Sequence, residues 1–273
     1  MMNCLQSWPE PVVRVQSLAA SGIQAIPERY IKPPSHRPLS KSDFSLPQEV
    51  NIPVIDFENV FSSDHRLRDE ALRCIYSACS EWGFFQVVNH GVSHELMKGV
   101  REMWREFFNL PVEVKQEYAN SPVTYEGYGS RLGVQKGASL DWSDYFFLHY
   151  MPVSLRNQNK WPATPASCSR RTVEEKEVLE AGSYHRIDLQ VLSNAIYQSV
   201  EHRVIVNSNK DRVSLAFFYN PKSDLLIEPS KELVTEDRPA LYPPMTFDEY
   251  RLYIRTKGPS GKKQVESLKS PRP

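Results

Sequence analysis

The sequence predicts an α+β protein, and three observations lead to this prediction. Two segments, Arg66–Trp82 and Ser93–Phe108, carry apolar residues at the spacing of amphipathic helices. Short apolar runs of the kind found in strands lie beside them, for example Phe84–Val88. Two β-rich runs, Glu201–Asn207 and Val213–Tyr219, flank a polar turn and therefore predict a hairpin.

The first half of the chain is predicted to combine short strands with helices. Residues 11–30 place apolar side chains at roughly helical spacing, and the proline-rich residues 31–48 predict an extended linker. A short strand is predicted over Ile52–Phe57. Gly83 then ends the following helix as its C′ residue, and Ser93 caps the next one.

The second half is predicted to contain more β-structure. Tyr125–Lys136 alternates glycine with aromatic and long side chains, as a β-hairpin region does, and Asp141–Leu148 predicts a strand with a polar start. Residues 151–170 are rich in proline and serine and predict a loop. The charged segment Thr172–Ala181 predicts a short helix, and a last helix is predicted over residues 246–257.

The composition excludes several classes of protein. The 33 Lys and Arg residues balance the 33 Asp and Glu residues, so neither nucleic acid nor an anionic membrane is expected as the main partner. No apolar run reaches the roughly 18 residues of a membrane span, and no secretory signal is visible. The four cysteines lack zinc-site spacing, so we expect reduced thiols in a cytoplasmic or nuclear protein: Cys4, Cys74, Cys79 and Cys168.

The predicted hairpin carries the most informative side chains. It places the imidazole of His202 and the guanidinium of Arg212 on neighbouring strands. An imidazole suits divalent iron, and a guanidinium suits a dicarboxylate. Ser214 shares a strand face with Arg212, because residues i and i+2 point the same way, and its hydroxyl adds a donor. The alternative for His202 is a packed or hydrogen-bonded histidine, the commoner role of this residue in a strand.

Several stretches of the chain resemble one family, the plant 2-oxoglutarate- and iron(II)-dependent dioxygenases. They include IPVIDF, EWGFFQVVNHGV, LDWSDYFFLHYMP and DRVSLAFFYNP, and the resemblance covers nearly the whole chain outside residues 170–189. The C-terminal LYPPMTFDEYRLYIRTKG is similar to the jasmonate-induced oxygenases. The resemblance implies a distorted double-stranded β-helix, or jelly roll, with flanking N-terminal helices. It also implies Fe(II), 2-oxoglutarate as cosubstrate and hydroxylation of a small carboxylic acid such as jasmonic acid.

The resemblance assigns roles to the three hairpin residues. His202 matches the second histidine of the family's facial triad, in which two histidines and one carboxylate bind iron. Arg212 and Ser214 match the pair that binds the distal carboxylate of 2-oxoglutarate.

The last predicted helix carries a candidate substrate site. Thr246 and Glu249 form a capping-box pattern, so the helix should begin there. A spacing of four places Phe247, Arg251 and Arg255 on one face. An aromatic ring with two guanidiniums suits a small carboxylic acid with an apolar body, in agreement with the resemblance to jasmonate-induced oxygenases. The alternative is a basic surface stripe that complements the C-terminal helix dipole.

The chain departs from the family pattern at the remaining iron ligands. The family supplies them as H-x-D on an earlier strand, but none of the seven histidines is followed two residues later by Asp or Glu. The family's preceding N-x-Y-P segment is absent as well, so we expect an incomplete jelly roll. His185 and Asp188 could act as substitute ligands only on a helix, where residues i and i+3 share a face. The alternative is a solvated junction.

These observations predict five regions: an N-terminal helix and linker (1–48), an N-terminal dioxygenase region (49–170), an aberrant junction (171–189), a C-terminal part of the dioxygenase domain (190–258) and a polar tail (259–273). Two functions remain open. One is the hydroxylation of a small carboxylic acid. The other is a non-catalytic product, a truncated isoform or gene-model fragment that at most binds a ligand or partner. The missing H-x-D favours the second for this chain.

Two further groups of residues have alternative interpretations. Asn89-His90-Gly91 looks like a metal motif, but its position after a strand predicts a structural turn. Tyr128, Arg131 and Trp142 either line the substrate side or pack in the core or on the surface.

Overall fold

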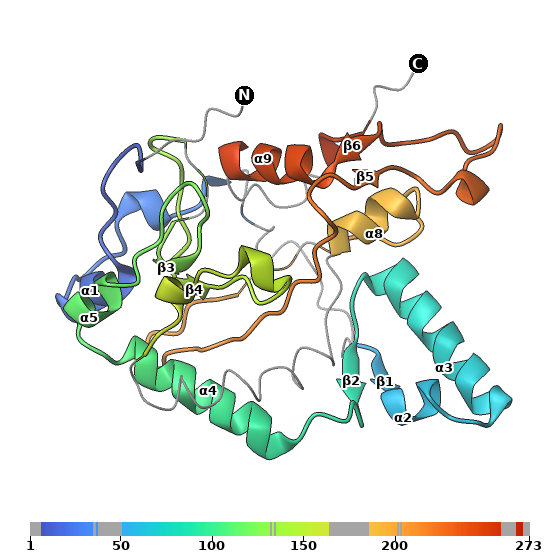
Figure 1. The fold of residues 1–273 in the computed structure, drawn as a ribbon, viewed down its shortest axis with the longest axis horizontal. Helices are drawn as coiled ribbons and strands as arrows, with labels where there is room; N and C mark the ends of the chain where they lie inside the picture. Colours follow the sequence, from blue (N-terminus) through green and yellow to red (C-terminus); the bar gives the residue numbers. More distant parts are fainter. Residues whose placement is uncertain are drawn as a thin grey trace.

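A computed structural model describes residues 7–34, 37, 51–131, 133, 135–163, 186–200, 202, 204–257 and 266–269. These residues form helices and three two-stranded sheets (Figure 1). The α-helices are α1 (Val15–Ala20), α2 (Phe57–Val60), α3 (His65–Ser77), α4 (His94–Phe108), α5 (Val112–Gln116), α8 (Arg186–Leu192) and α9 (Phe247–Lys257). Single 3-10 or π-helical turns are η1 (Glu28–Tyr30), η4 (Ala78–Trp82), η5 (Val153–Leu155), η6 (Gln158–Lys160) and η7 (Lys231–Leu233). The strands are β1 (Val54–Asp56), β2 (Gln86–Val88), β3 (Gly127–Gly129), β4 (Tyr145–Phe147), β5 (Leu226–Ile227) and β6 (Met245–Thr246).

The elements predicted between residues 51 and 110 are confirmed. β1 pairs in parallel with β2. α3 continues into η4 and ends at Gly83, whose φ of 71° is left-handed, and a Cβ there would overlap the main-chain oxygen of Gln198. α4 follows Ser93, whose hydroxyl accepts a hydrogen bond from the N–H of Leu96 at 3.0 Å.

α4 builds the core of the N-terminal half. Four residues of its apolar face are buried together with Tyr128 of β3: Val100, Met103, Trp104 and Phe107. The ring of Phe107 stands edge-on to that of Phe146, with 4.8 Å between centroids, which joins the helix to β4. β3 and β4 pair antiparallel, which confirms a strand within residues 141–148. The β-hairpin region predicted over Tyr125–Lys136 is confirmed only at Gly127–Gly129, because the described residues that follow, 130, 131, 133, 135 and 136, form no strand.

The carboxylate of Asp144 fixes α1 from a distant part of the chain. Its two oxygens accept hydrogen bonds from the N–H groups of Val15 and Gln16, both at 2.9 Å. N–H groups in the first turn of a helix lack partners within the helix, and the helix dipole favours a negative charge there. The same carboxylate accepts a hydrogen bond from the hydroxyl of Tyr128 at 3.2 Å, so it joins α1 to the β3–β4 sheet.

A second hydrophobic core lies at the C-terminal end. Its buried residues come from α8, β5 and α9 and from the loop before β6: Val191, Ile227, Tyr242, Phe247 and Tyr250. The predicted capping box is confirmed, because the N–H of Glu249 donates to Oγ1 of Thr246 at 3.2 Å and the N–H of Thr246 donates to Oε2 of Glu249 at 2.7 Å. α9 runs from this core towards the β3–β4 sheet (Figure 1).

The prediction of a hairpin over residues 201–219 is wrong in its strands. The described residues 204–218 contain no strand, although the turn is present, with Oδ1 of Asn207 accepting from the N–H groups of Asn209 and Lys210 at 2.8 and 3.0 Å. Ile205 is 74% exposed and Phe218 is 56% exposed. High β-propensity makes a strand only where a neighbouring strand accepts its backbone hydrogen bonds and covers its side chains.

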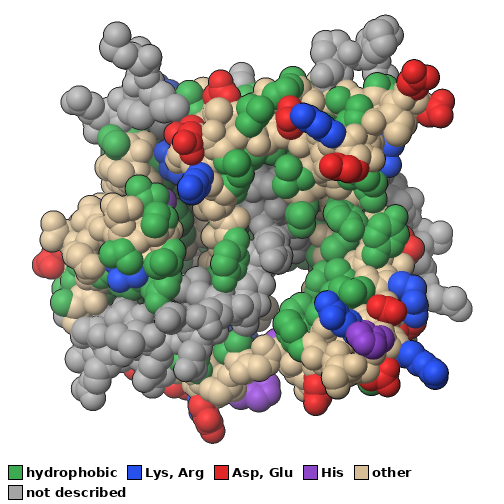
Figure 2. Space-filling view, turned by 45° about the vertical axis from the view of Figure 1, so that its right-hand side comes forward, with side chains coloured by type: hydrophobic (Ala, Val, Ile, Leu, Met, Phe, Trp, Pro, Cys, Tyr) green, Lys and Arg blue, Asp and Glu red, His purple; other side chains and the backbone are tan. Residues whose placement is uncertain are grey.

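The jelly roll is not assembled within the described ranges, where each of the three sheets has two strands. Hydrophobic side chains are spread over the face of the molecule drawn in Figure 2. The helix predicted over Thr172–Ala181 lies outside the described residues. Among the helices that are described, none combines the length and apolarity needed to cross a membrane.

We expect the purified chain to unfold over a broad range and to self-associate on heating. The reason is that Val204, Ile205 and Val206 are exposed and outside any described sheet, and such segments pair with other chains. Far-UV circular dichroism, tryptophan fluorescence and light scattering on one sample test this. A monomer with a single sharp transition and the same midpoint in both spectroscopic signals would contradict it.

Glu10 holds the N-terminal segment by an ionic network. Its Oε1 lies 2.7 Å from Nη1 of the buried Arg131 and 2.9 Å from Nη2 of Arg29, and it accepts a hydrogen bond from the N–H of Gly137 at 3.1 Å. The hydrogen bonds from Arg131 and from the N–H of Gly137 lower the pKa of Glu10 from 4.5 to about 2, against the opposing effect of burial.

Glu10→Gln should lower the free energy of unfolding at pH 7 by about 1–3 kcal/mol. Because the pKa of Glu10 is depressed on folding, its contribution is fully present above pH 4.5 and is lost as the pH falls through about 2. Thermal midpoints from pH 7 to pH 2.5 should therefore converge for the two proteins on acidification. The matched control is Glu113→Gln on the exposed side of α5, which should change the midpoint little at any pH.

Candidate functional site

The three hairpin residues with predicted roles lie on exposed, irregular chain. His202, Arg212 and Ser214 are all exposed, and Nδ1 of His202 lies 3.3 Å from the carbonyl oxygen of Val200. The shared strand face expected for Arg212 and Ser214 is absent, because no strand forms over them. The structure therefore does not bring these side chains together on a sheet.

The residues that the structure describes do not fit an iron site. Among them, no three His, Cys, Asp or Glu side chains are grouped so as to hold a metal ion. A facial triad needs two histidines and one carboxylate with open positions, and this region supplies His202 without the other two. His185 and the side chain of Asp188 lie outside the described residues, although Asp188 belongs to α8.

The first arginine of α9, Arg251, is held by contacts with three side chains. Arg251 forms an ion pair with Asp248, and its Nη2 donates to Oγ of Ser223 at 3.1 Å. Its guanidinium carbon lies 5.3 Å from the ring centroid of Phe247, which is 3% exposed in the C-terminal core. The Nε atom of Arg251 is buried and has no acceptor among the described residues. Phe247 thus packs in the core and supports Arg251.

The second arginine of α9 reaches the N-terminal half. The guanidinium carbon of Arg255 lies 4.9 Å from the ring centroid of Tyr125, the residue two positions before β3. Tyr125 is buried, and its φ of 61° is left-handed. Burial raises the pKa of Tyr125, and the positive charge of Arg255 opposes this. The stack therefore joins α9 to the β3–β4 sheet.

A buried acid and a half-buried histidine lie near these arginines. Glu126 is 2% exposed, and its Oε1 accepts a hydrogen bond from the main-chain N–H of His149 at 3.1 Å. Burial lowers the pKa of His149, Arg251 and Arg255 lower it further, and Glu126 opposes them. The lowered pKa favours the neutral imidazole at pH 7, so the positive charge that the described residues place here comes from the arginines.

The alternatives left open for Tyr128, Arg131 and Trp142 are decided by their contacts. Tyr128 is fully buried in the core around α4. Arg131 pairs with Glu10, as described above, and Trp142 packs edge-on against Tyr30 with 5.0 Å between ring centroids. These contacts are those of packing residues.

Asn89-His90-Gly91 forms the predicted structural turn. Nδ2 of Asn89 donates to Oδ2 of Asp56 at 2.9 Å, and Nδ1 of His90 accepts from the N–H of Val92 at 3.2 Å. Both Asn89 and Gly91 have positive φ, at 51° and 80°. Since Nδ1 of His90 accepts a main-chain hydrogen bond, the imidazole serves the turn.

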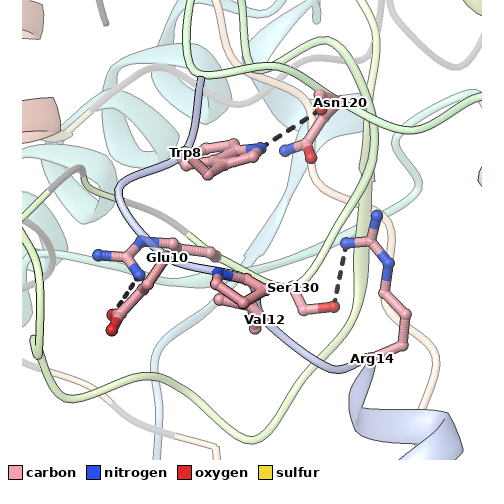
Figure 3. A pocket seen from close by; sticks show the side chains of 8 residues that line it. Trp8, Glu10, Val12, Arg14, Asn120 and Ser130 are labelled. Atoms are coloured by element: carbon pink, nitrogen blue, oxygen red, sulfur yellow. Dashed lines mark hydrogen bonds and ion pairs between the residues drawn. The ribbon is translucent and has the colours of Figure 1, made fainter.

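A small cavity of about 170 Å³ lies between the N-terminal segment and the end of β3 (Figure 3). Its walls are held by their own hydrogen bonds: Nε1 of Trp8 donates to the carbonyl oxygen of Asn120 at 3.4 Å, and Nη1 of Arg14 donates to Oγ of Ser130 at 3.3 Å. Arg131, for which a place on the substrate side was one alternative, lines this cavity, whereas the six residues with assigned binding roles do not: His202, Arg212, Ser214, Phe247, Arg251 and Arg255.

Tyr125, Glu126 and His149 were not predicted as site residues. No local pattern marks them, because each acquires its surroundings from a segment far away in the chain. The run GYGS, which follows Tyr125 and Glu126 closely, is the one available signal, since it predicts close packing of backbone in that region.

Two family profiles match the chain in succession. The profile of the non-haem dioxygenase N-terminal region in morphine synthesis matches residues 52–164, and that of the 2OG-Fe(II) oxygenase superfamily matches residues 156–221. Jasmonate-induced oxygenase 2 of Arabidopsis thaliana is 44% identical over 358 aligned positions, covering 98% of this chain and 96% of that protein. Leucoanthocyanidin dioxygenase of Malus domestica is 30% identical over 334 positions, covering 87% of this chain and 93% of that protein.

A solved structure is similar over almost the same length. The crystal structure of JOX2 in complex with 2OG, Fe and JA has a TM-score of 0.83 at 42% identity, and the match covers 97% of this chain and 100% of that chain. This similarity relates the chain to the double-stranded β-helix fold of the superfamily, although the described residues form only two-stranded sheets.

The alignment with jasmonate-induced oxygenase 2 is longer than this chain. It spans 358 positions, whereas this chain has 273 residues, so at least 85 positions, the difference between the two, have no residue here. Because the similarity extends over nearly the whole chain at up to 44% identity, the chain belongs to the 2-oxoglutarate- and Fe(II)-dependent oxygenase superfamily, whose members use Fe(II) and 2-oxoglutarate, and it is similar to the jasmonate-induced oxygenases.

Proposed function

We propose that this chain derives from enzymes that hydroxylate a small carboxylic acid such as jasmonic acid, and that it retains a site for the acid without the means to oxidise it. One observation carries the proposal: no histidine of the chain is followed two residues later by Asp or Glu, so the H-x-D pair of ligands is missing. We place the gap at the junction predicted over residues 171–189. The jelly roll is then incomplete, and the chain is a non-catalytic member of its family.

The missing H-x-D affects metal binding first. A protein that offers Fe(II) only His202 lacks two of the three ligands of a facial triad. Removing even an outer-shell partner of a ligand lowers metal affinity by about 10- to 100-fold, so losing two ligands should lower it by several orders of magnitude. His202 is also exposed, which leaves it hydrated and mobile as a ligand.

The residues that we propose for the cosubstrate are present but exposed. Arg212 and Ser214 remain the residues that we propose for the distal carboxylate of 2-oxoglutarate. Both are exposed, and an exposed ion pair contributes only about 0–1 kcal/mol. We therefore expect weak binding of 2-oxoglutarate that depends on ionic strength.

The arginines that we propose for binding the acid lie on α9. Arg251 and Arg255 are partly buried on one face of α9, each stacked on an aromatic ring, Phe247 and Tyr125 respectively. The buried Nε of Arg251 has no described acceptor, and a buried donor without a partner costs about 1–3 kcal/mol. A carboxylate placed between the two guanidiniums would relieve this cost.

Fe(II) binding and turnover test the loss of catalysis. After anaerobic incubation with Fe(II) and desalting, the purified chain should hold less than one iron per molecule, measured by mass spectrometry of the metal. It should also form no succinate from 2-oxoglutarate. Jasmonate-induced oxygenase 2 of Arabidopsis thaliana, treated in parallel, is the positive control. One tightly held iron per chain together with succinate formation would contradict the proposal and would make His185 and Asp188 the ligands to test next.

Substitution of Arg255 tests the acid site. Arg255→Ala should weaken the binding of jasmonic acid by about 10- to 100-fold, because a charge-assisted hydrogen bond in a partly desolvated site contributes about 1.5–3 kcal/mol. Binding of methyl jasmonate, which carries no charge, should change much less. Isothermal titration calorimetry with both compounds gives the two dissociation constants.

Two further variants complete this experiment. Arg212→Ala should weaken the binding of 2-oxoglutarate and leave the affinity for jasmonic acid nearly unchanged. Arg101→Ala, on the exposed side of α4, removes one positive charge away from α9 and controls for the net charge of the protein. Equal losses for acid and ester in Arg255→Ala, or no loss, would return α9 to the alternative of a basic surface stripe.

A further inference from the structure

We propose that Tyr125 is a positioning residue of the acid site, and that its ring holds the guanidinium of Arg255 in the orientation that receives a carboxylate. The proposal rests on the proposed function of α9 and identifies the part of the N-terminal half that completes the site. The structural observation is the contact itself: the guanidinium carbon of Arg255 lies 4.9 Å from the ring centroid of Tyr125.

Tyr125 is held rigidly. Its main-chain N–H donates to the carbonyl oxygen of Ser121 at 2.9 Å, and its φ of 61° belongs to the left-handed region, which a non-glycine residue occupies only when its surroundings impose it. The ring of Trp8 stands edge-on to it at 5.3 Å between centroids, and the side chain is 5% exposed. The ring of Tyr125 is therefore a fixed surface on which Arg255 lies.

Stacking and carboxylate recognition use different parts of a guanidinium. An aromatic ring engages its flat face, whereas a carboxylate binds two N–H groups along its edge. An arginine can thus keep both partners at once. The ring also restricts the rotamers of a long side chain, so less conformational entropy is lost when the ligand binds.

The two arginines of α9 differ in this respect. Arg251 is restrained by polar groups, through its ion pair with Asp248 and its hydrogen bond to Ser223, and part of its charge is compensated. Arg255 stacks on an aromatic ring that is itself buried, 4.9 Å from guanidinium carbon to ring centroid. The positioning role is therefore assigned to Tyr125, at the end of α9 that faces the β3–β4 sheet.

The test compares jasmonic acid with methyl jasmonate in five proteins: the unmodified chain, Tyr125→Leu, Tyr125→Phe, Arg255→Ala and the double variant Tyr125→Leu/Arg255→Ala. Tyr125→Leu should weaken the binding of jasmonic acid by about two- to tenfold, the range expected for loss of a partly desolvated cation–π contact. The affinity for methyl jasmonate should not change. Tyr125→Phe keeps the ring face and should bind the acid like the unmodified chain. In the double variant Tyr125→Leu/Arg255→Ala, the loss should equal that of Arg255→Ala alone, because Tyr125 acts through Arg255.

Each other outcome has a defined meaning. Equal losses of acid and ester in Tyr125→Leu would show a general packing role and would overturn the inference. A loss for Arg255→Ala with none for Tyr125→Leu would overturn the inference and leave the acid site standing. No loss for Arg255→Ala would overturn the proposed acid site itself.

A second measurement covers the case in which Tyr125→Leu does not fold. Phenylalanine analogues with increasing numbers of ring fluorines, placed at position 125, keep the shape of the ring and progressively weaken its attraction for a cation. Acid affinity should fall stepwise with fluorination at constant ester affinity. An acid affinity that is independent of fluorination would overturn the inference.

Discussion

A β-strand is stable only when a neighbouring strand pairs with its backbone, and this requirement explains most of what is unusual in the protein. Residues 204–218 have the composition of strands, yet within the described chain they form none and leave Ile205 and Phe218 exposed. The alignment with jasmonate-induced oxygenase 2 of Arabidopsis thaliana contains at least 85 positions at which this chain has no residue. Under the proposed loss of jelly-roll strands, residues 204–206 would lack the neighbours that pair with a strand.

The same requirement separates the metal chemistry from the rest of the molecule. A facial triad exists only where strands from different parts of the chain bring three side chains to one point. His202, Arg212 and Ser214 are present in the sequence, but without an assembled sheet they lie on exposed chain. With the roles proposed for these three residues, removal of strands would therefore abolish the metal chemistry first, because that chemistry depends on their convergence.

The N-terminal half has a hydrophobic core of its own. Its core is made by α4 and the β3–β4 sheet, and Asp144 and Glu10 bind the N-terminal segment through hydrogen bonds and ion pairs supplied within this half. α9 then links the halves, with Phe247 anchored in the C-terminal core and Arg255 stacked on Tyr125. The acid site proposed on this link depends on these two cores and on none of the roles proposed for His202, Arg212 and Ser214.

The sequence by itself determined the elements whose signals are local. The caps at Ser93 and Thr246 and the stop at Gly83 were predictable because each is satisfied by atoms within a few residues. The family was also readable, since its motifs survive in order, and so was the absence of H-x-D. Only the tertiary structure decided that the hairpin strands do not form and that Arg255 stacks on Tyr125. Those outcomes depend on pairing and packing between segments far apart in the chain, and local propensity contains no information about whether a distant partner is present.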